Sequence, residues 1–141
     1  MAGEKILIVE DEPITAEALS LMLKELKYEP VDTASTGEEA IHLAQKYRPD
    51  VILMDIILDG EKTGIQASAL IHEKMNIPII FLTAYGDMET LEKAKATEPL
   101  GYIVKPITDS SNLRANIELA VYNDKIRKKL QSDSQIGRAH V

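Results

Sequence analysis

The sequence contains no cysteine and no tryptophan among its 141 residues, and only one phenylalanine. The lack of cysteine excludes a disulfide framework, a thiolate metal site and a cysteine nucleophile. No apolar run approaches the roughly 20 residues that span a bilayer, and neither G-x-G-x-x-G nor G-x-x-x-x-G-K-[ST] occurs. We therefore expect a cytoplasmic chain without membrane contact, and we do not expect a nucleotide-binding module.

The formal net charge of -7 is distributed unevenly along the chain. Residues 124–141 contain five basic and two acidic residues, a local charge of +3, which leaves -10 for residues 1–123. An acidic body disfavours direct nucleic-acid binding. We interpret the basic residues near the C-terminus as a solvated helix face rather than a phosphate-binding arm. The length is typical of one domain with one ordinary core.

Four short apolar runs each end in polar residues. The runs are 6–9, 51–54, 79–82 and 102–104, and they end at Glu10-Asp11, Asp55, Thr83-Ala84 and Lys105-Pro106. Short apolar runs without alternation are typical of a parallel sheet that is covered on both faces. Ligands of such sheets bind outside the carboxyl ends of the strands. We therefore expect acids, a hydroxyl and a lysine to converge at one edge of the sheet.

Helical patterns separate the strand-like runs. Helices are predicted over 13–27, 36–47 and 65–75, with a short one around 88–96 and a last one that begins near 110. The first is predicted from Pro13 and from the spacing of Ile14, Ala18, Leu21, Met22 and Leu26. Thr36 and Glu39 form the pattern of a capping box. A weaker strand over 28–34 contains Pro30, which indicates an edge position.

These motifs, taken in order, resemble the receiver domain of two-component response regulators. The segments that carry the resemblance are 8–12 (IVEDE), 53–55 (LMD), 81–84 (FLTA) and 101–106 (GYIVKP), within a likeness that runs from about Lys5 to Tyr122. The resemblance implies a flavodoxin-like (βα)5 fold, a doubly wound parallel sheet with strand order 2-1-3-4-5. We expect the last helix to extend at its C-terminus.

The resemblance also implies a role for each polar residue at the strand ends. Asp55 would accept a phosphoryl group, and Thr83 and Lys105 would contact that group and complete the catalytic set. Glu10 and Asp11 would hold a divalent ion with Asp55. Tyr102 would be an aromatic switch that works with Thr83. The phosphoryl donor would be a phosphohistidine on a sensor histidine kinase or a phosphotransfer protein.

Elementary chemistry supports such a site independently. Glu10, Asp11 and Asp55 would crowd negative charge, which costs free energy unless a cation or proton intervenes. Oxygen ligands suit Mg²⁺ or Mn²⁺, and the main-chain carbonyl of Ile57 is the further ligand that we expect. Phosphoryl transfer requires compensation of charge on the equatorial oxygens. The Ala84 N–H would supply part of that compensation, beside the lysine and the threonine hydroxyl.

Self-catalysed phosphotransfer and slow self-hydrolysis are the only reactions that we expect. Ile57 and Tyr85, each two residues beyond a site residue, would flank the phosphoryl group and hinder the hydrolytic water. Two alternatives remain open. One is a docking module that is never phosphorylated. The other is an aspartate-nucleophile phosphatase, but a second aspartate two residues after Asp55 is missing because Ile57 stands there.

The domain boundaries are expected as follows. Residues 1–123 form the receiver domain, 124–135 form a helical extension or linker, and 136–141 form a non-native tail. The last interpretation is based on the likeness of IGRAHV to a translated short-read sequencing adapter. Output would pass through the face of the fourth helix, fifth strand and last helix, which would also be the contact of a homodimer.

Overall fold

The computed structural model describes residues 3–58, 63–84 and 101–139, with side chains up to residue 131. The strands are β1 (Lys5–Val9), β2 (Glu29–Ala34), β3 (Val51–Asp55), β4 (Ile79–Thr83) and β5 (Gly101–Val104). The helices are α1 (Pro13–Glu25), α2 (Gly37–Tyr47), α3 (Gly64–Met75) and α5 (Ser110–Ala139). The short helix predicted around 88–96 lies outside the described residues. None of the described helices combines the length and the apolar character needed to cross a membrane.

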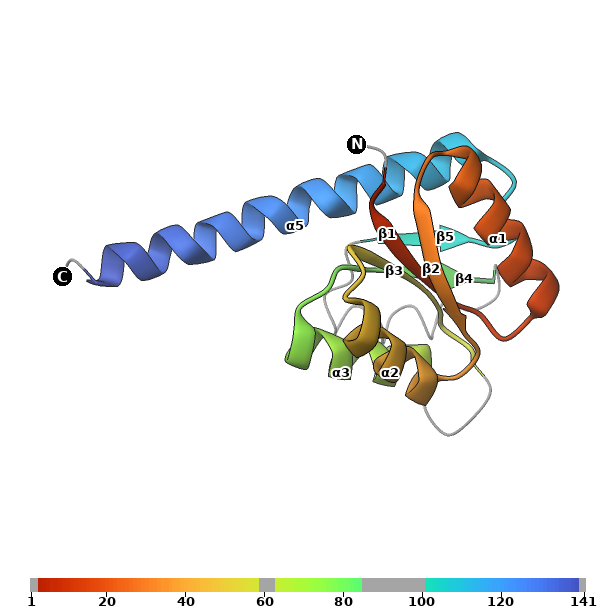
Figure 1. The fold of residues 1–141 in the computed structure, drawn as a ribbon, viewed down its shortest axis with the longest axis horizontal. Coiled ribbons are helices and arrows are strands. Elements are labelled where there is room, and N and C mark those ends of the chain that lie inside the picture. Colours follow the sequence, from red (N-terminus) through yellow and green to blue (C-terminus); the bar gives the residue numbers. More distant parts are fainter. Residues whose placement is uncertain (1–2, 59–62, 85–100, 140–141) are drawn as a thin grey trace.

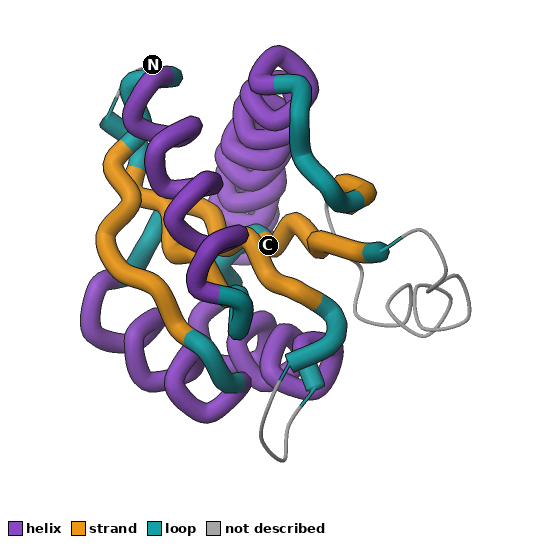
Figure 2. Tube along the Cα trace, turned by 90° about the vertical axis from the view of Figure 1, so that its right-hand side faces the viewer, coloured by secondary structure: helices purple, strands orange, loops and turns teal. Residues whose placement is uncertain are grey.

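The five strands form one parallel sheet in the order β2-β1-β3-β4-β5. Helices α1 and α5 lie on one side of the sheet, and α2 and α3 lie on the other (Figures 1 and 2). The predicted flavodoxin-like fold and its strand order are confirmed. β2 is an edge strand, as its proline indicated, and its register with β1 shifts between Ile6 and Leu7.

The sheet divides the apolar core into two layers. All residues of β3 and β4 are buried, and successive side chains of a strand point to opposite faces. Leu7, Ile52 and Phe81 therefore face α2 and α3, whereas Ile8 and Leu53 face α1 and α5. Burial on both faces explains why these strands are uninterrupted apolar runs in the sequence.

Helix α1 presents a different face to the core from the one that its most obvious pattern suggested. The buried residues are Ala16, Leu19 and Leu23, whereas Ile14 and Leu21 are 85% and 54% exposed. The helix is apolar on more than one side, so spacing alone predicts that it is a helix but not which side packs. The position of α1 against the sheet determines which side is buried.

The helix starts agree with the prediction in part. The Thr36 hydroxyl accepts a hydrogen bond from the Glu39 N–H at 3.1 Å, as expected. The Glu39 carboxylate, however, accepts from the Ser35 N–H rather than from that of Thr36. The complete capping box lies at α3, where Thr63 and Gln66 each accept from the backbone N–H of the other.

Helix α5 begins at the expected cap, where the Asp109 carboxylate accepts a hydrogen bond from the Ser111 N–H at 2.9 Å. It continues to Ala139 and projects well beyond the sheet (Figure 1). The extension predicted for 124–135 is thus helical and continuous with α5. Residues 136–139 are part of the same helix, and their interpretation as a non-native tail stays a hypothesis.

One glycine is required by a close backbone contact next to Asp55. The Gly64 N–H donates to the Ile56 carbonyl at 2.9 Å, and a Cβ at Gly64 would overlap the carbonyl oxygen of Asp55. Gly64→Ala should therefore lower the free energy of unfolding by about 1 to 3 kcal/mol, measured by urea denaturation. Gly101→Ala is the control, because its Cβ would meet only the Asn116 side chain at 3.3 Å. Equal losses in the two variants would contradict this account.

Candidate functional site

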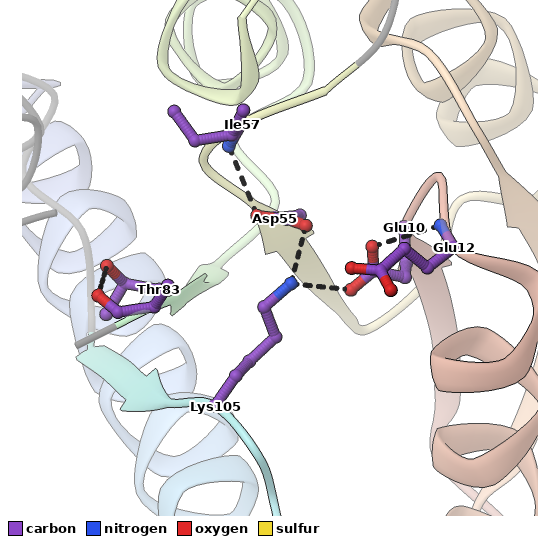
Figure 3. A network of polar contacts seen from close by, with 7 residues as sticks. Glu10, Glu12, Asp55, Ile57, Thr83 and Lys105 are labelled. Atoms are coloured by element: carbon purple, nitrogen blue, oxygen red, sulfur yellow. Dashed lines mark hydrogen bonds and ion pairs between the residues drawn. The ribbon is translucent and has the colours of Figure 1, made fainter. Parts of the chain in front are cut away.

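Polar residues from three strands meet at the carboxyl edge of the sheet, as the sequence predicted. Glu10 follows β1, Asp55 ends β3 and Lys105 follows β5. The parallel register places Val9 beside Met54 and Asp55 beside Leu82, so the strand ends are level with one another. Figure 3 shows the lysine side chain reaching across this edge to both carboxylates.

Lys105 is the centre of the site. Its Nζ lies 2.8 Å from Asp55 Oδ2 and 3.0 Å from Glu10 Oε1. The side chains of Lys105, Asp55 and Glu10 are 17%, 6% and 0% exposed, respectively. The backbone supports this arrangement, because the Lys105 N–H donates to the Thr83 carbonyl at 2.7 Å and so keeps the segment after β5 against β4. Hydrogen bonds between ions at this degree of burial are stronger than those in open water.

The charges of the site change the proton affinity of its members. Burial, together with the neighbouring Asp55, raises the pKa of Glu10 from its ordinary 4.5 to about 7, against the opposing effect of Lys105. Burial by itself lowers the pKa of Lys105, but its contacts with Asp55 and Glu10 outweigh that effect, so the net direction is upward. The site therefore has too few positive charges for its carboxylates.

Three carboxylates could hold a metal ion. Oxygen atoms of Glu10, Asp11 and Asp55 lie within 4.8 Å of one another. Backbone groups orient two of them: the Ile57 N–H donates to Asp55 Oδ1 at 3.1 Å, and the Glu12 N–H donates to Glu10 Oε2 at 3.2 Å (Figure 3). An all-oxygen donor set with a shortage of positive charge fits a hard divalent cation.

The remaining predicted residues lie around this centre. Thr83 is buried, and its hydroxyl donates to the Ala84 carbonyl at 3.1 Å rather than to Asp55. Tyr102 on the edge strand β5 is 52% exposed, and Ile57 is 53% exposed. Tyr85 lies outside the described residues, so slow self-hydrolysis stays a prediction.

Sequence reasoning named the Ile57 carbonyl and the Ala84 N–H but missed two backbone donors of the site. The N–H groups of Glu12 and Ile57 hold the two carboxylates in place, and Gly64 makes room for the Asp55 carbonyl. The residue type does not show which backbone N–H will donate, because every residue except proline has one. Only the glycine gave a signal, because it stands in the loop after β3 and begins the next helix.

The raised pKa of Glu10 makes stability depend on pH. The folded protein keeps a proton that the unfolded chain releases from about pH 4.5 upward, so without metal the contribution of Glu10 to the free energy of unfolding should fall until about pH 7. The slope is at most about 1.4 kcal/mol per pH unit. Glu10→Gln should flatten it in urea denaturation with a chelator present, whereas Glu12→Gln, at an exposed position, should not. An unchanged slope in Glu10→Gln would contradict this assignment.

Comparisons with known proteins agree with this arrangement. Residues 6–118 match the family model of the response regulator receiver domain. The transcriptional regulatory protein PdtaR of Mycobacterium tuberculosis is 38% identical over 117 residues, which cover 83% of this chain and 56% of that protein. The chemotaxis protein CheY of Halobacterium salinarum is 33% identical over 114 residues, covering 80% of this chain and 93% of that protein.

Solved structures show the same likeness. The signal receiver domain of a modulated diguanylate cyclase from Desulfovibrio desulfuricans G20 superimposes with a TM-score of 0.83 at 37% identity, covering 89% of this chain and 98% of that chain. The present chain spans about half the length of the curated transcriptional regulators that it matches. From its sequence, its sheet and these matches, the chain belongs to the response regulator receiver domain family of two-component signalling.

Proposed function

We propose that the chain accepts a phosphoryl group on Asp55 from a phosphohistidine of a sensor histidine kinase or phosphotransfer protein. The observation that carries the proposal is the buried contact of Lys105 with Asp55 and Glu10 at 2.8 and 3.0 Å. A structural ion pair needs only one carboxylate. This lysine instead forms ion pairs with two carboxylates, at the edge of the sheet where ligands bind. The protein would act as a signalling domain and not on external substrates.

The transfer forms one bond and breaks another. An Asp55 carboxylate oxygen attacks phosphorus, a P–O bond forms, and the P–N bond of the donor breaks so that the imidazole leaves with the electron pair. The Ile57 N–H at Oδ1 and Lys105 at Oδ2 hold the carboxylate in one orientation before the reaction. Preorganised donors of this kind need no rearrangement when charge develops.

The acidic cluster would hold Mg²⁺ or Mn²⁺ through Glu10, Asp11 and Asp55, with the Ile57 carbonyl as a further ligand. When bound, the ion supplies positive charge to the equatorial phosphoryl oxygens. Lys105, the Thr83 hydroxyl and the Ala84 N–H would contact the same oxygens from the protein side. Together these groups supply the positive charge that the site lacks.

Signal output would follow from movement of Thr83. Its hydroxyl now donates to the Ala84 carbonyl, and a phosphoryl group on Asp55 offers it a charged acceptor instead. The movement would vacate space for the half-exposed ring of Tyr102. It would so alter the face of β5 and α5, to which the predicted fourth helix, outside the described residues, would also belong. This is a shift between two conformations, one of which binds the phosphoryl group better. An effector or a second copy would read that face, and a cytoplasmic location stays a prediction.

The first test is the intact mass after incubation with Mg²⁺ and a small acyl phosphate. We expect a single phosphoryl adduct in the unmodified chain and none in Asp55→Asn, because that variant lacks the attacking oxygen. Glu12→Gln is the matched control, since its exposed side chain lies near the site but only its backbone N–H takes part. It should keep the adduct.

The same assay separates the alternatives. An adduct that needs both Asp55 and the metal supports phosphoryl acceptance. Failure of the acyl phosphate and of a phosphohistidine donor with folded protein would favour a docking module that is never phosphorylated. An adduct that persists in Asp55→Asn would refute Asp55 as the acceptor.

The second test separates acceptance from output. Thr83→Ala should still form the adduct but should reduce the phosphorylation-dependent change in the Tyr102 ring resonances, followed by nuclear magnetic resonance. Ser68→Ala is the matched control, because Ser68 is an equally buried hydroxyl that donates within α3 at 2.8 Å. A full Tyr102 response in Thr83→Ala would exclude the proposed coupling.

A further inference from the structure

A pocket at the amino edge of the sheet lies away from the acceptor site. Its volume is about 370 Å³, within the range of roughly 300 to 1,000 Å³ that is usual for small-molecule sites. Three segments line it: the turn before β3, the connection before β4, and α5. The five residues of β3 separate this edge from Asp55, by roughly 13 Å at about 3.3 Å per residue. The pocket is therefore a second site, which the receiver chemistry does not use.

The wall of the pocket is apolar and held in place by the sheet. It consists of three buried and two half-buried side chains, which are Pro49, Ile77 and Pro78, and Met75 and Val121, respectively. Backbone hydrogen bonds fix the two segments that precede the strands. The Asp50 N–H donates to the Lys5 carbonyl at 2.8 Å, and the Ile52 N–H donates to the Pro78 carbonyl at 3.0 Å. The pocket is thus pre-formed, as sites for small molecules usually are.

The rim of the pocket is cationic. Three basic residues line it: Arg48 from the turn before β3, and Lys125 and Lys128 from α5. All three residues are exposed. The body of the chain, residues 1–123, has a net charge of -10. A positive rim on an acidic body attracts small anions to this edge of the sheet in preference to the others.

Two carboxylates also line the pocket, but each already has a partner. Asp50 Oδ2 accepts a hydrogen bond from the Lys5 N–H at 2.7 Å. Asp124 is buried, and its two oxygens pair with Arg127 at 2.7 Å and with Lys128 at 2.9 Å. Asp124 and its two partners together keep one positive charge, and the lysine ammonium has further N–H donors to offer. The lining therefore favours an anion over a cation.

We propose that this pocket binds an organic phosphate. Three cations favour a doubly charged group over a carboxylate, and the apolar wall favours a ligand with an apolar body. The phosphate oxygens would contact Arg48, Lys125 and Lys128, and the apolar body would lie against Ile77 and Val121. The sequence suggested only a solvated face for the lysines of α5. The pocket gives two of them a role in ligand binding.

A ligand held in this way would restrain α5 where the helix leaves the sheet. Arg48 ends α2, whereas Lys125 and Lys128 follow Ala120, the last core residue of α5. The ligand would therefore join the turn before β3 to the beginning of the projecting part of the helix (Figure 1). The site would be regulatory, and it does not depend on phosphoryl transfer to Asp55.

Phenylphosphonate is the first probe, because it combines a ring with a doubly charged group that cannot be transferred to Asp55. It is titrated into the chain in mildly alkaline buffer with a chelator, and the methyl resonances of Ile77 and Val121 are followed by nuclear magnetic resonance. We expect saturable shifts with a dissociation constant on the order of 1 mM, which is ordinary for a ligand of about ten non-hydrogen atoms. Added salt should weaken the binding.

Two further probes separate the charge from the ring. Inorganic phosphate keeps the charge without the ring, and benzylamine keeps the ring with the opposite charge. Each should bind roughly tenfold more weakly than phenylphosphonate, because one of the two interactions is lost. Equal binding of benzylamine would overturn the role of the cations. Equal binding of inorganic phosphate would overturn the role of the apolar wall.

A pair of matched variants locates the binding. Lys125→Gln should weaken phenylphosphonate binding about fivefold, whereas Lys129→Gln should leave it unchanged. Both lysines are exposed residues of α5, but only Lys125 lines the pocket, so the two variants lose the same charge at different places. Equal losses would show a general attraction to the basic helix and would refute the site. Shifts that are absent at Ile77 and Val121 would refute it as well.

The same samples test the restraint of α5. At saturation with phenylphosphonate, amide hydrogen exchange over residues 125–131 should slow about threefold. Unchanged exchange in a saturated sample would overturn the regulatory role. Asp55→Asn should bind phenylphosphonate as the unmodified chain does, so failure of phosphoryl acceptance would not be confused with failure of this site.

Discussion

The contact of one ammonium group with two carboxylates is the interaction on which this site depends. Lys105 comes from the end of β5, whereas Glu10 and Asp55 come from β1 and β3. Without a cation between them, two buried carboxylates would repel one another, and one would take up a proton. The lysine therefore joins three strands electrostatically, in addition to the hydrogen bonds that join them as a sheet. It also leaves negative charge in excess, which is the condition for recruiting a divalent ion.

At this edge of the sheet, burial has opposite effects on the lysine contacts and on the charge of Glu10. The burial that strengthens the lysine contacts also raises the pKa of Glu10 to about 7. Near neutral pH, the metal-free protein thus keeps a group that is close to its protonation midpoint. Functional sites often store such unfavourable charge, because ligand binding can then relieve it. The apolar core on both sides of the sheet supplies the stability that the site lacks.

Much of this structure could be predicted from sequence because its strands are buried on both faces. Uninterrupted apolar runs that end in acids, threonine and lysine predict both the sheet and the convergence of Glu10, Asp55 and Lys105. The packing side of α1 could not be predicted, because that helix has more than one apolar stripe. The N–H groups of Glu12 and Ile57 were equally hidden, because a backbone donor is the same in every residue except proline. The extent of α5 was indicated by the helical spacing of its apolar residues. Which of these residues are exposed depends on the side of the helix that meets the sheet.

The length of α5 has a mechanical consequence. Its inner face contacts β3, β4 and β5, including the strands that carry Asp55 and Thr83 at their ends. If the helix moves as one rigid body, a change in its angle at the sheet produces a displacement that grows with distance along the helix. A tilt of about 5° at the sheet would move the far end by roughly 2 Å, since the 15 residues beyond Asp124 span roughly 22 Å at 1.5 Å per residue. Displacements at the sheet that are too small to open the core would thus be larger farther along the helix.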